Sequence, residues 1–210
     1  MLYKWYEFGL MIIFVSFLGF VVENVWLAAT KGYMDNRNMN LPFLLGYGLT
    51  CIAIYFLMGT PSQMIFFRKI SVKASKWCRV LLYFLCAMIL VSLGEIALGT
   101  ITEKLGHIEY WNYTAIPLHI TKYTSVPTSI GFSMGITLFM DRYFPALMTA
   151  FQQMQGEHIR FVVSAMLVVL TCDYLYCYRK MLKTQDFYTK WRFLMPQRRR
   201  QSIPPVNESA

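Results

Sequence analysis

The chain has little charge, and long stretches of it have none. Only 15% of its 210 residues are charged, whereas a soluble domain of this size carries about a quarter. Acidic residues are the scarcer sign, with 11 Asp and Glu against 20 Lys and Arg and a formal net charge of +9. The basic residues cluster beside apolar runs, which is typical of cytoplasmic loops and of segments near anionic headgroups. This distribution disfavours nucleic-acid binding, so we expect no nucleic-acid partner.

Several motifs that would indicate a particular enzyme reaction are also missing. The chain contains no Gly-rich phosphate-binding loop, so it does not itself hydrolyse ATP by that route. It contains no HExxH motif and no paired-cysteine motif. The five cysteines lie within or beside apolar segments and have no histidines at zinc-ligand spacing. They are most simply small apolar fillers, and we predict no metal and no cofactor.

Apolar residues are plentiful instead, at 56% of the chain, and they are gathered into runs. A membrane helix needs about 20 mostly apolar residues to cross ~30 Å of hydrocarbon. The candidate segments are residues 8–29, 43–59, 80–101, 128–140 and 161–178. The first run continues without a signal-peptide cleavage site, so we interpret it as a retained helix. The sequence thus predicts an all-α protein, a polytopic bundle of about four to six transmembrane helices in the cytoplasmic membrane, with five spans as the best estimate.

The chain ends in a basic segment whose side of the membrane is in question. We divide it into a transmembrane domain, residues 1–178, and a basic, partly disordered tail, residues 179–210, in which residues 187–195 resemble a surface-lying anchor. Five full crossings would split Lys and Arg eight to twelve between the two sides, whereas a tail that returned would give sixteen to four. The positive-inside rule therefore predicts that the basic loop 68–79 and the tail share the cytoplasmic side. No internal repeat is apparent.

Two glutamates, Glu23 and Glu95, interrupt the first and third apolar runs. Ionisable groups inside a membrane are costly, which makes them candidates for function. At 1.5 Å per residue, each glutamate lies roughly 10–12 Å along its helix from the nearer loop. The first and third helices run in the same direction, so both carboxyl groups should lie at a similar depth in the membrane. Each also follows a stripe of small or polar residues, which normally faces other helices. We predict that both point into one bundle interior, and leave open that they only bridge helices as neutral acids.

Polar and aromatic side chains from the flanking loops share the end of the bundle near these glutamates. Arg37 is the natural counter-charge for a glutamate, because a guanidinium binds a carboxylate through two hydrogen bonds; a headgroup anchor is the alternative. Asp173 would join the same layer only if all five segments cross. The candidate substrate or ion site consists of Glu23, Glu95, Arg37, Asn36, Trp111 and Tyr113. Elsewhere, Gly131 and Gly135 form a GxxxG pattern that predicts a close helix crossing.

Short motifs occur in a fixed order along roughly residues 8–175. They are Gly19-Phe-Val-Val-Glu23, Asn36-Arg37, Gly46-Tyr47-Gly48, Glu95-Ile-Ala-Leu-Gly99 and Trp111-Asn112-Tyr113-Thr114, with Asp173 at an acidic position in the last run. In these motifs the chain resembles the CmpB-like family of ABC-transporter type IV permeases and the related animal transmembrane-229 proteins. The chain departs from the family at Asn38, where Gly is usual, and at Asn112, where Asp is usual. The family implies a transporter permease and names no substrate.

Three functions from different classes remain open at this point. The first is a transporter or permease-like component with a polar site at Glu23 and Glu95, which would need a separate ATP-binding subunit or another energy source. The second is a membrane-embedded enzyme acting on lipid-type substrates, with the two glutamates as acid and base. The third is a non-catalytic membrane scaffold. We favour the first and assign no catalytic residue; the expected partners are the lipid bilayer, a separate ATP-binding subunit and, as a further alternative, a homo-oligomer.

Overall fold

The computed structural model describes residues 3–195, and most of them are helical. The helices are α1 (Trp5–Lys31), α2 (Leu45–Met58), α3 (Lys76–Gly106), α4 (Val126–Leu138), the π-helix η1 (Phe139–Tyr143), α5 (Phe144–Gln153) and α6 (Glu157–Thr184). Short strands lie in the connections: β1 (Tyr33–Asp35), β2 (Gly59–Thr60), β3 (Gln63–Phe66), β4 (Ile70–Ser71), β5 (His119–Thr121), β6 (Thr124–Ser125) and β7 (Arg192–Leu194). Most of the predicted apolar runs are therefore the middles of longer helices, whose polar flanks continue the helical hydrogen bonding.

Local sequence signals set several helix ends. The Ser75 hydroxyl accepts a hydrogen bond from a first-turn amide of α3. At the start of α4, Ser125 and Thr128 form a capping box, and Pro127 fits because a first-turn residue needs no amide donor. α1 ends at Gly32, whose φ of 72° is the left-handed conformation that glycine adopts without steric cost.

The fourth predicted segment, residues 128–140, continues as a helix past Asp141 and Arg142. α4, η1 and α5 form one bent helix, because the backbone stays right-handed helical at Phe139 and Tyr143, where the three pieces join. Pro145 follows η1 at the start of α5. A proline ring inside a helix clashes with the carbonyl four residues earlier, and the wider turn of a π-helix accommodates it.

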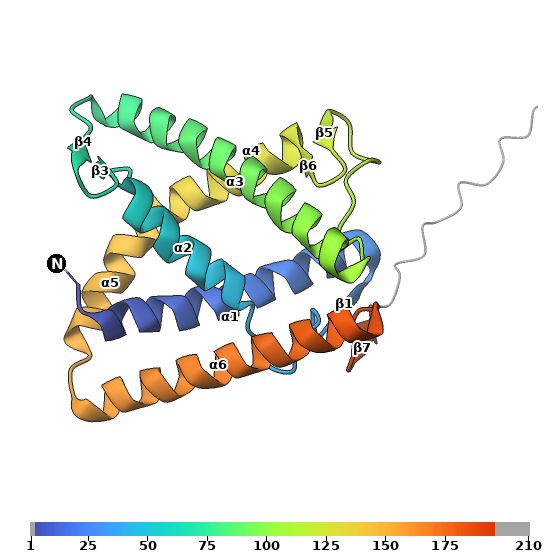
Figure 1. Ribbon diagram of the computed structural model, residues 1–210. Helices are drawn as coiled ribbons and strands as arrows, with labels where there is room; N and C mark the ends of the chain where they lie inside the picture. The colour runs from blue at the N-terminus through green and yellow to red at the C-terminus, as the bar shows by residue number, and fades with distance from the viewer. Residues whose placement is uncertain (1–2, 196–210) are drawn as a thin grey trace, which may run out of the picture.

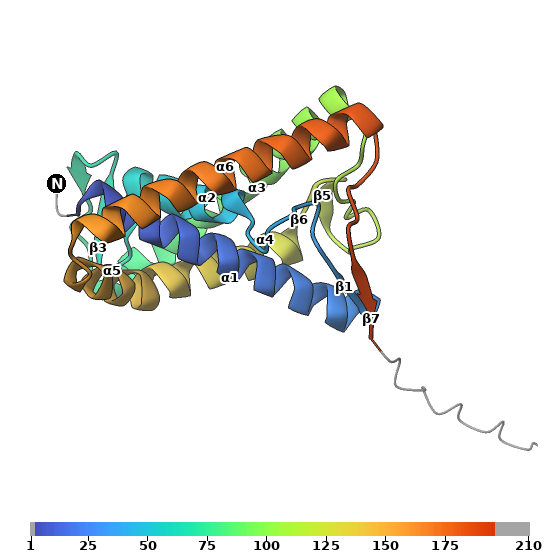
Figure 2. The ribbon, with the colours of Figure 1, turned by 90° about the horizontal axis from the view of Figure 1, so that it is seen from below.

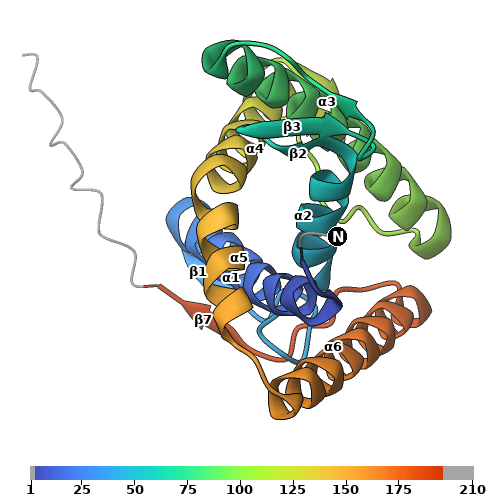
Figure 3. The same ribbon diagram turned by 90° about the vertical axis from the view of Figure 1, so that its left-hand side faces the viewer.

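The helices alternate in direction along the bundle. α1, α3 and α6 run one way, and α2 and the α4–η1–α5 helix run back (Figures 1 and 2). One end of the bundle therefore holds the start of α1, strands β2 to β4 and the α5–α6 turn, and the other holds β1, β5, β6 and β7. Viewed along the bundle, α3 and α6 lie at opposite edges, with α1, α2 and the α4–η1–α5 helix between them (Figure 3).

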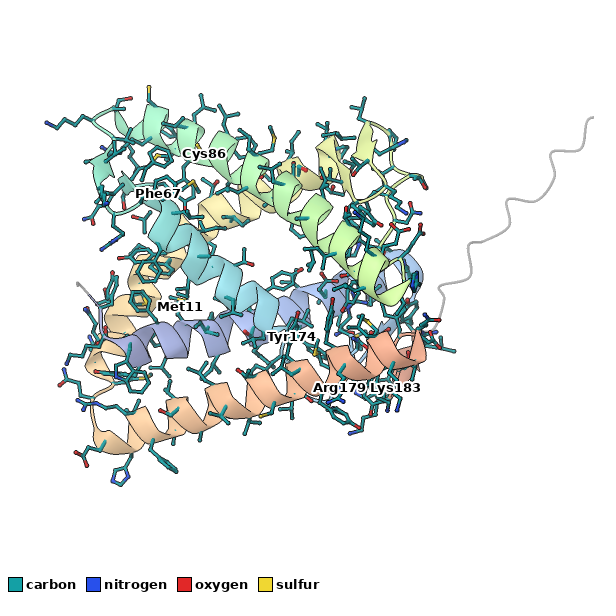
Figure 4. All side chains as sticks on the ribbon, viewed as in Figure 1. Met11, Phe67, Cys86, Tyr174, Arg179 and Lys183 are labelled. Carbon is teal, nitrogen blue, oxygen red and sulfur yellow. The ribbon has the colours of Figure 1, made fainter. Side chains whose placement is uncertain are left out.

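The best-packed part of the bundle lies towards the β2–β4 end. Met11 of α1 and Phe144 and Met148 of α5 are fully buried there, and the Phe144 ring stacks on Tyr55 of α2 with 4.8 Å between centroids (Figure 4). Tyr83 of α3 is also fully buried and donates a hydrogen bond of 3.1 Å to the carbonyl of Gly59. These contacts join α1, α2, α3 and α5, and in a bilayer such packing is what holds helices together.

Three helices are long and apolar enough to cross a membrane, namely α1, α3 and α6, and α2 is a shorter apolar helix. Large apolar side chains cover their outward faces; examples are Trp26, Leu93 and Val168, which are 63%, 59% and 62% exposed. Exposed apolar surface on this scale is typical of a face that contacts lipid or another protein. The described chain is thus a mostly helical protein with the features of a membrane protein.

The sequence predicts one side of the membrane for the basic loop and the tail, and the structure places the described part of the tail at the opposite end of the bundle from that loop. Arg68 of the basic loop lies over the Tyr55 ring, 5.1 Å from its centroid, at the end where α1 begins. β7 instead pairs antiparallel with β1, at the end where α1 stops. In Figure 4, Phe67 marks the first end, and Arg179 and Lys183 lie towards the other. Loop charges alone could not reveal a pairing between strands so far apart in the sequence.

The segment predicted to be a surface anchor pairs with β1 and packs beside the end of α1. Residues 192–194 form β7, and the Trp191 ring packs against Phe20 of α1 with 6.4 Å between centroids. Residues 179–184 belong to α6, so this helix passes the predicted domain boundary at residue 178. The rest of the predicted tail, residues 196–210, lies outside the described residues.

Candidate functional site

Glu23 of α1 is held by an arginine and a tyrosine from the next two elements. Arg37, in the loop after β1, places Nη2 3.0 Å from Oε2 of Glu23, and the Tyr47 hydroxyl of α2 donates to Oε1 at 2.5 Å. The ion pair predicted from the sequence is therefore present, and its two side chains are only 23% and 24% exposed. The Asp35 carboxylate fixes the loop by accepting the Arg37 amide at 2.9 Å.

Gly19, one helical turn before Glu23, makes room for the tyrosine. A Cβ atom added at Gly19 would lie 2.5 Å from the Tyr47 ring, so only glycine allows the ring to lie flat on α1. The ring position in turn aims the hydroxyl at Glu23. We call Gly19, Glu23, Arg37 and Tyr47 the Glu23 cluster.

A second cluster of the same construction joins α3 to the loop before α4. The Tyr123 ring lies on Gly99, where an added Cβ would be 2.4 Å away, and the Tyr123 hydroxyl donates to Glu103, one turn further along α3. Lys122 forms an ion pair with the same carboxylate. The hydrogen bond from the Lys122 ammonium to Glu103 raises the pKa of Lys122 above its usual range. We call Gly99, Glu103, Lys122 and Tyr123 the Glu103 cluster.

The two clusters reveal a recurrence that the sequence did not suggest. In both, a glycine supports a tyrosine ring, a glutamate four residues later accepts the tyrosine hydroxyl, and a basic loop residue completes the ion pair. The signal that could have revealed it is the spacing Gly-x-x-x-Glu, which occurs at Gly19 and Glu23 and again at Gly99 and Glu103. Tyr47, Glu103 and Tyr123 were missed as site residues because this pattern is short.

Glu95, one turn before Gly99, is surrounded by hydroxyl groups. The Thr124 hydroxyl donates to Oε2 of Glu95 at 2.7 Å, and Thr124 and Ser92 lie 3.1 and 2.9 Å from the hydroxyl of Ser129. The Tyr113 phenol lies near enough to the same carboxyl group for the Glu95 charge to raise the pKa of Tyr113. In the part of the chain that the structure describes, Glu95 takes part in no ion pair. These residues, Ser92, Glu95, Tyr113, Thr124 and Ser129, form the Glu95 cluster.

Tyr113 links the surroundings of the two predicted glutamates. Its pKa is raised above the usual range by burial and then by the negative charges of Glu95 and Glu23. Both carboxyl groups therefore act on one phenol, although they come from α1 and α3. The two helices run in the same direction, as the sequence required (Figure 1), and each glutamate lies in the second half of its helix.

The other two predicted site residues have their polar atoms engaged by the backbone. Asn36 is buried, donates to the Met39 and Tyr188 carbonyls at 2.8 and 2.9 Å, and accepts the Lys190 amide at 2.8 Å. Trp111 donates from its indole nitrogen to the Tyr123 carbonyl at 2.8 Å. Asn36 thus joins the loop after α1 to the segment after α6, and Trp111 positions the Glu103 cluster.

Asp173 of α6 reaches the layer of these loops. Its carboxylate accepts hydrogen bonds from the Asn40 side chain at 2.8 Å and from the Leu41 amide at 3.0 Å. Asp173 therefore fastens the loop before α2 to α6.

The predicted close crossing at Gly131 and Gly135 does not occur within the described residues. An added Cβ at either position would meet nothing within 4 Å, so both glycines lie on the outer face of α4. Nor do the described residues contain a group of three or more His, Cys, Asp or Glu side chains that could hold a metal. The five cysteines are free thiols, and only Cys51 and Cys177 are buried as apolar fillers would be.

The two glutamates therefore differ in what they can do chemically. The charge of Glu23 is balanced by Arg37, whereas Glu95 has only hydroxyl donors. A proton or a bound cation would balance the charge of the Glu95 carboxylate. The Arg37 Nε atom is buried and has no partner among the described residues, which leaves one donor beside the Glu23 cluster. The arrangement therefore offers a carboxyl group without a counter-charge, that of Glu95, and a buried N–H donor, that of Arg37.

Long apolar helices with partly buried carboxylates define the class first: a helical membrane protein with polar groups in its interior. The family model described as "Putative ABC-transporter type IV" matches residues 10–178. Because this match covers most of the chain, the chain belongs to that family, as the sequence motifs indicated. Comparisons with curated proteins and with solved structures find no match.

Proposed function

We propose that the chain is the membrane-embedded component of a transporter, with a polar site formed by Glu23 and Glu95 within the bundle. The observation that carries this proposal is the convergence of both carboxyl groups on Tyr113, one of them paired with a cation and the other not. Membership of an ABC-transporter family supports the transporter class. A family of this description also supports a separate ATP-binding subunit as the partner.

The proposal includes five crossings of the cytoplasmic membrane: α1, α2, α3, the α4–η1–α5 helix and α6. The alternating directions of these elements support it. α2, with 14 residues, is about 21 Å long, so its span would be completed by the apolar residues that flank it or by local thinning of the bilayer.

Labelling from each side of the membrane tests these crossings. A cysteine at Lys73 and a cysteine at Asp186, both at exposed positions in opposite end loops, should react with an impermeant thiol reagent from opposite sides. The matched control is a pair of cysteines at Lys73 and Gln63. These positions lie at the same end of the bundle, so both cysteines should react from the same side. Labelling of Lys73 and Asp186 from one side would contradict five crossings.

Purification from native membranes tests the transporter role. We expect the tagged chain to retain, at fixed stoichiometry, a protein that carries a Gly-rich phosphate-binding loop, and we expect ATP hydrolysis by the complex to change when Glu95 is replaced by glutamine. A chain that copurifies only with a chemically altered lipid would favour a membrane enzyme instead. A chain with neither, whose glutamine variants complement a deletion fully, would favour a scaffold.

A further inference from the structure

A line of polar side chains follows the inner face of α4, one every four residues. Ser129, Ser133 and Thr137 are 1%, 0% and 7% exposed. Asp141 of η1 continues the same spacing. Buried positions in a membrane helix are usually apolar or small, and a carboxyl group among them is costly and rare. Serine and threonine are common at such interfaces, so the feature that calls for an explanation is the half-buried carboxyl group of Asp141 in line with them.

The π-helix keeps Asp141 in line with the hydroxyls. A line of residues four apart drifts around an α-helix, because one turn holds only 3.6 residues. The turn of η1 holds more residues, because its hydrogen bonds run from residue i to i+5, and this offsets the drift. The Asp141 side chain is 17% exposed, whereas that of the neighbouring Arg142 is 71% exposed.

The line begins at the Glu95 cluster. Ser129 lies 3.1 Å from the Thr124 hydroxyl, which donates to Glu95. A carboxyl group therefore lies at each end, Glu95 of α3 and Asp141 of η1. Tyr113 is the titratable group near Glu95. Arg142 is the charged group near Asp141, with Arg142 Nε 3.4 Å from the Asp141 carboxylate.

An unpaired hydroxyl lies in the middle of this line. The Oγ1 atom of Thr137 is buried and has no hydrogen-bond partner among the described residues. Buried polar atoms are almost always hydrogen-bonded to protein or to ordered water. The next hydroxyl, that of Ser133, bonds to the Ser129 carbonyl of its own helix. A polar molecule small enough for a helix interface would satisfy Thr137, and water fits that description.

We propose that this line is a path for protons between Glu95 and Asp141, with water bridging the hydroxyl groups. Successive members are about 6 Å apart along the helix axis, which is too far for a direct hydrogen bond and suitable for one intervening water. From Ser129 to Asp141 the path covers about 18 Å of a hydrocarbon core of ~30 Å.

The chemistry needs only exchange of O–H bonds. Each hydroxyl or water accepts a proton on a lone pair and releases its own proton to the next oxygen, and the two carboxyl groups take up and deliver the proton at the ends. A metal cation would need several oxygen ligands around it at once. A single line of hydroxyls supplies one at a time, which favours the proton.

The path shares one premise with the proposed function, namely that α3 and the α4–η1–α5 helix cross the bilayer, and the labelling experiment tests that premise by itself. A missing ATP-binding partner would refute the transporter role and leave the path intact. A missing proton flux would refute the path and leave the copurification result intact.

The test is proton flux into liposomes that contain the purified full-length chain and a trapped pH dye, driven by a potassium diffusion potential. We expect the chain to conduct protons above the rate of protein-free liposomes. Glu95→Gln and Asp141→Asn should each lower the flux at least tenfold, because a terminal carboxyl is lost. Thr137→Val, which keeps the shape and removes the hydroxyl, should lower it severalfold, and Thr137→Ser should restore it.

The matched control is Thr171→Val, because Thr171 is an exposed α6 threonine that bonds to the Leu167 carbonyl of its own helix at 2.7 Å; its flux should equal that of the unaltered chain. The proposal is overturned if the unaltered chain conducts no better than protein-free liposomes, or if Thr137→Val conducts normally. It is also overturned if the flux follows a sodium gradient and ignores pH. If Asp141→Asn fails to fold, the Thr137 pair still decides the matter.

Discussion

Glu23 and Glu95 each lie in the second half of a helix, yet their carboxyl groups are stabilised in different ways. Glu23 has a full positive charge at 3.0 Å and a phenol donor, and a glycine shapes the helix surface around it. Glu95 has hydroxyl donors and no cation among the described residues. The first arrangement fixes a charge in place, and the second leaves the charge free to be exchanged. The comparison separates an acid whose charge is held by a fixed partner from one whose charge can be exchanged.

The Glu103 cluster supports this distinction. It repeats the glycine, tyrosine and basic residue of the Glu23 cluster, and it also pairs its glutamate with a cation. Of these three glutamates of α1 and α3, Glu95 is therefore the one without a counter-charge.

The largest effect should come from removing the cation of the Glu23 cluster. Arg37→Met leaves a partly buried carboxylate without compensation, which should lower the free energy of unfolding by about 3 kcal/mol. The measurement is thermal unfolding in detergent. Adding Glu23→Gln to Arg37→Met should recover much of the loss, because no unpaired charge remains. A double variant as unstable as the single one would mean that the ion pair is not the cause.

Glycine replacements should give the next largest effect and separate the clusters from ordinary helix positions. Gly19→Ala and Gly99→Ala place a methyl group against a tyrosine ring, and such overpacking costs about 1–3 kcal/mol. The control is Gly94→Ala on α3, where an added Cβ meets nothing within 4 Å. There alanine should stabilise the helix by roughly 0.5–1 kcal/mol. Equal shifts in melting temperature at Gly94 and Gly99 would contradict the ring contact.

The glutamine variants should sharpen the comparison itself. Glu95→Gln keeps an acceptor for Thr124 and removes no ion pair, so we expect a loss of about 1 kcal/mol or less. Glu23→Gln leaves Arg37 without its charged partner and should cost more, roughly 1.5–3 kcal/mol. The functional effects should have the opposite rank, with the larger loss at Glu95. Melting temperatures and a complementation assay, run on the same pair of variants, would check both orders.

The smallest effect should be a pH dependence at Lys122. Its pKa is raised, chiefly by the hydrogen bond to Glu103, so its contribution to stability is complete below the unfolded pKa of about 10.4 and is lost as the pH rises through the folded pKa. The advantage of the unaltered chain over Lys122→Met should therefore stay constant up to about pH 10 and shrink as the pH rises further. Lys69→Met is the control, because Lys69 forms no ion pair among the described residues. The same shrinkage in that variant would remove the assignment to Lys122.

Much of the helical architecture could be predicted from the sequence, because apolar length decides it. The runs 8–29, 80–101 and 161–178 lie inside α1, α3 and α6, which extend a few residues further at each end. The Glu23–Arg37 ion pair was also predictable, since depth, charge and a short loop restrict the choices. The strand pair β1–β7 was not, because its residues are separated by most of the chain and carry no periodic signal.

Only part of the candidate site could be predicted from the sequence, for a similar reason. Glu23, Glu95, Arg37 and Tyr113 stood out by charge or by their place in the loops, and the structure relates all four to the same region. Thr124 did not stand out, because a threonine in a loop has no distinguishing feature before β6 brings it to α3. Gly131 and Gly135 stood out, and they face outward, because a GxxxG pattern indicates a smooth helix surface without specifying what lies against it.

The pairing of β1 with β7 also has a consequence for biogenesis. Asn36 and Asn38, which follow β1, bond to Tyr188 and Lys190, so the loop between α1 and α2 completes its hydrogen bonds only after residue 190 has been synthesised. The loop between α1 and α2 is therefore synthesised early and completed late, after α6 has been made. A chain truncated before residue 188 would keep that loop unfinished.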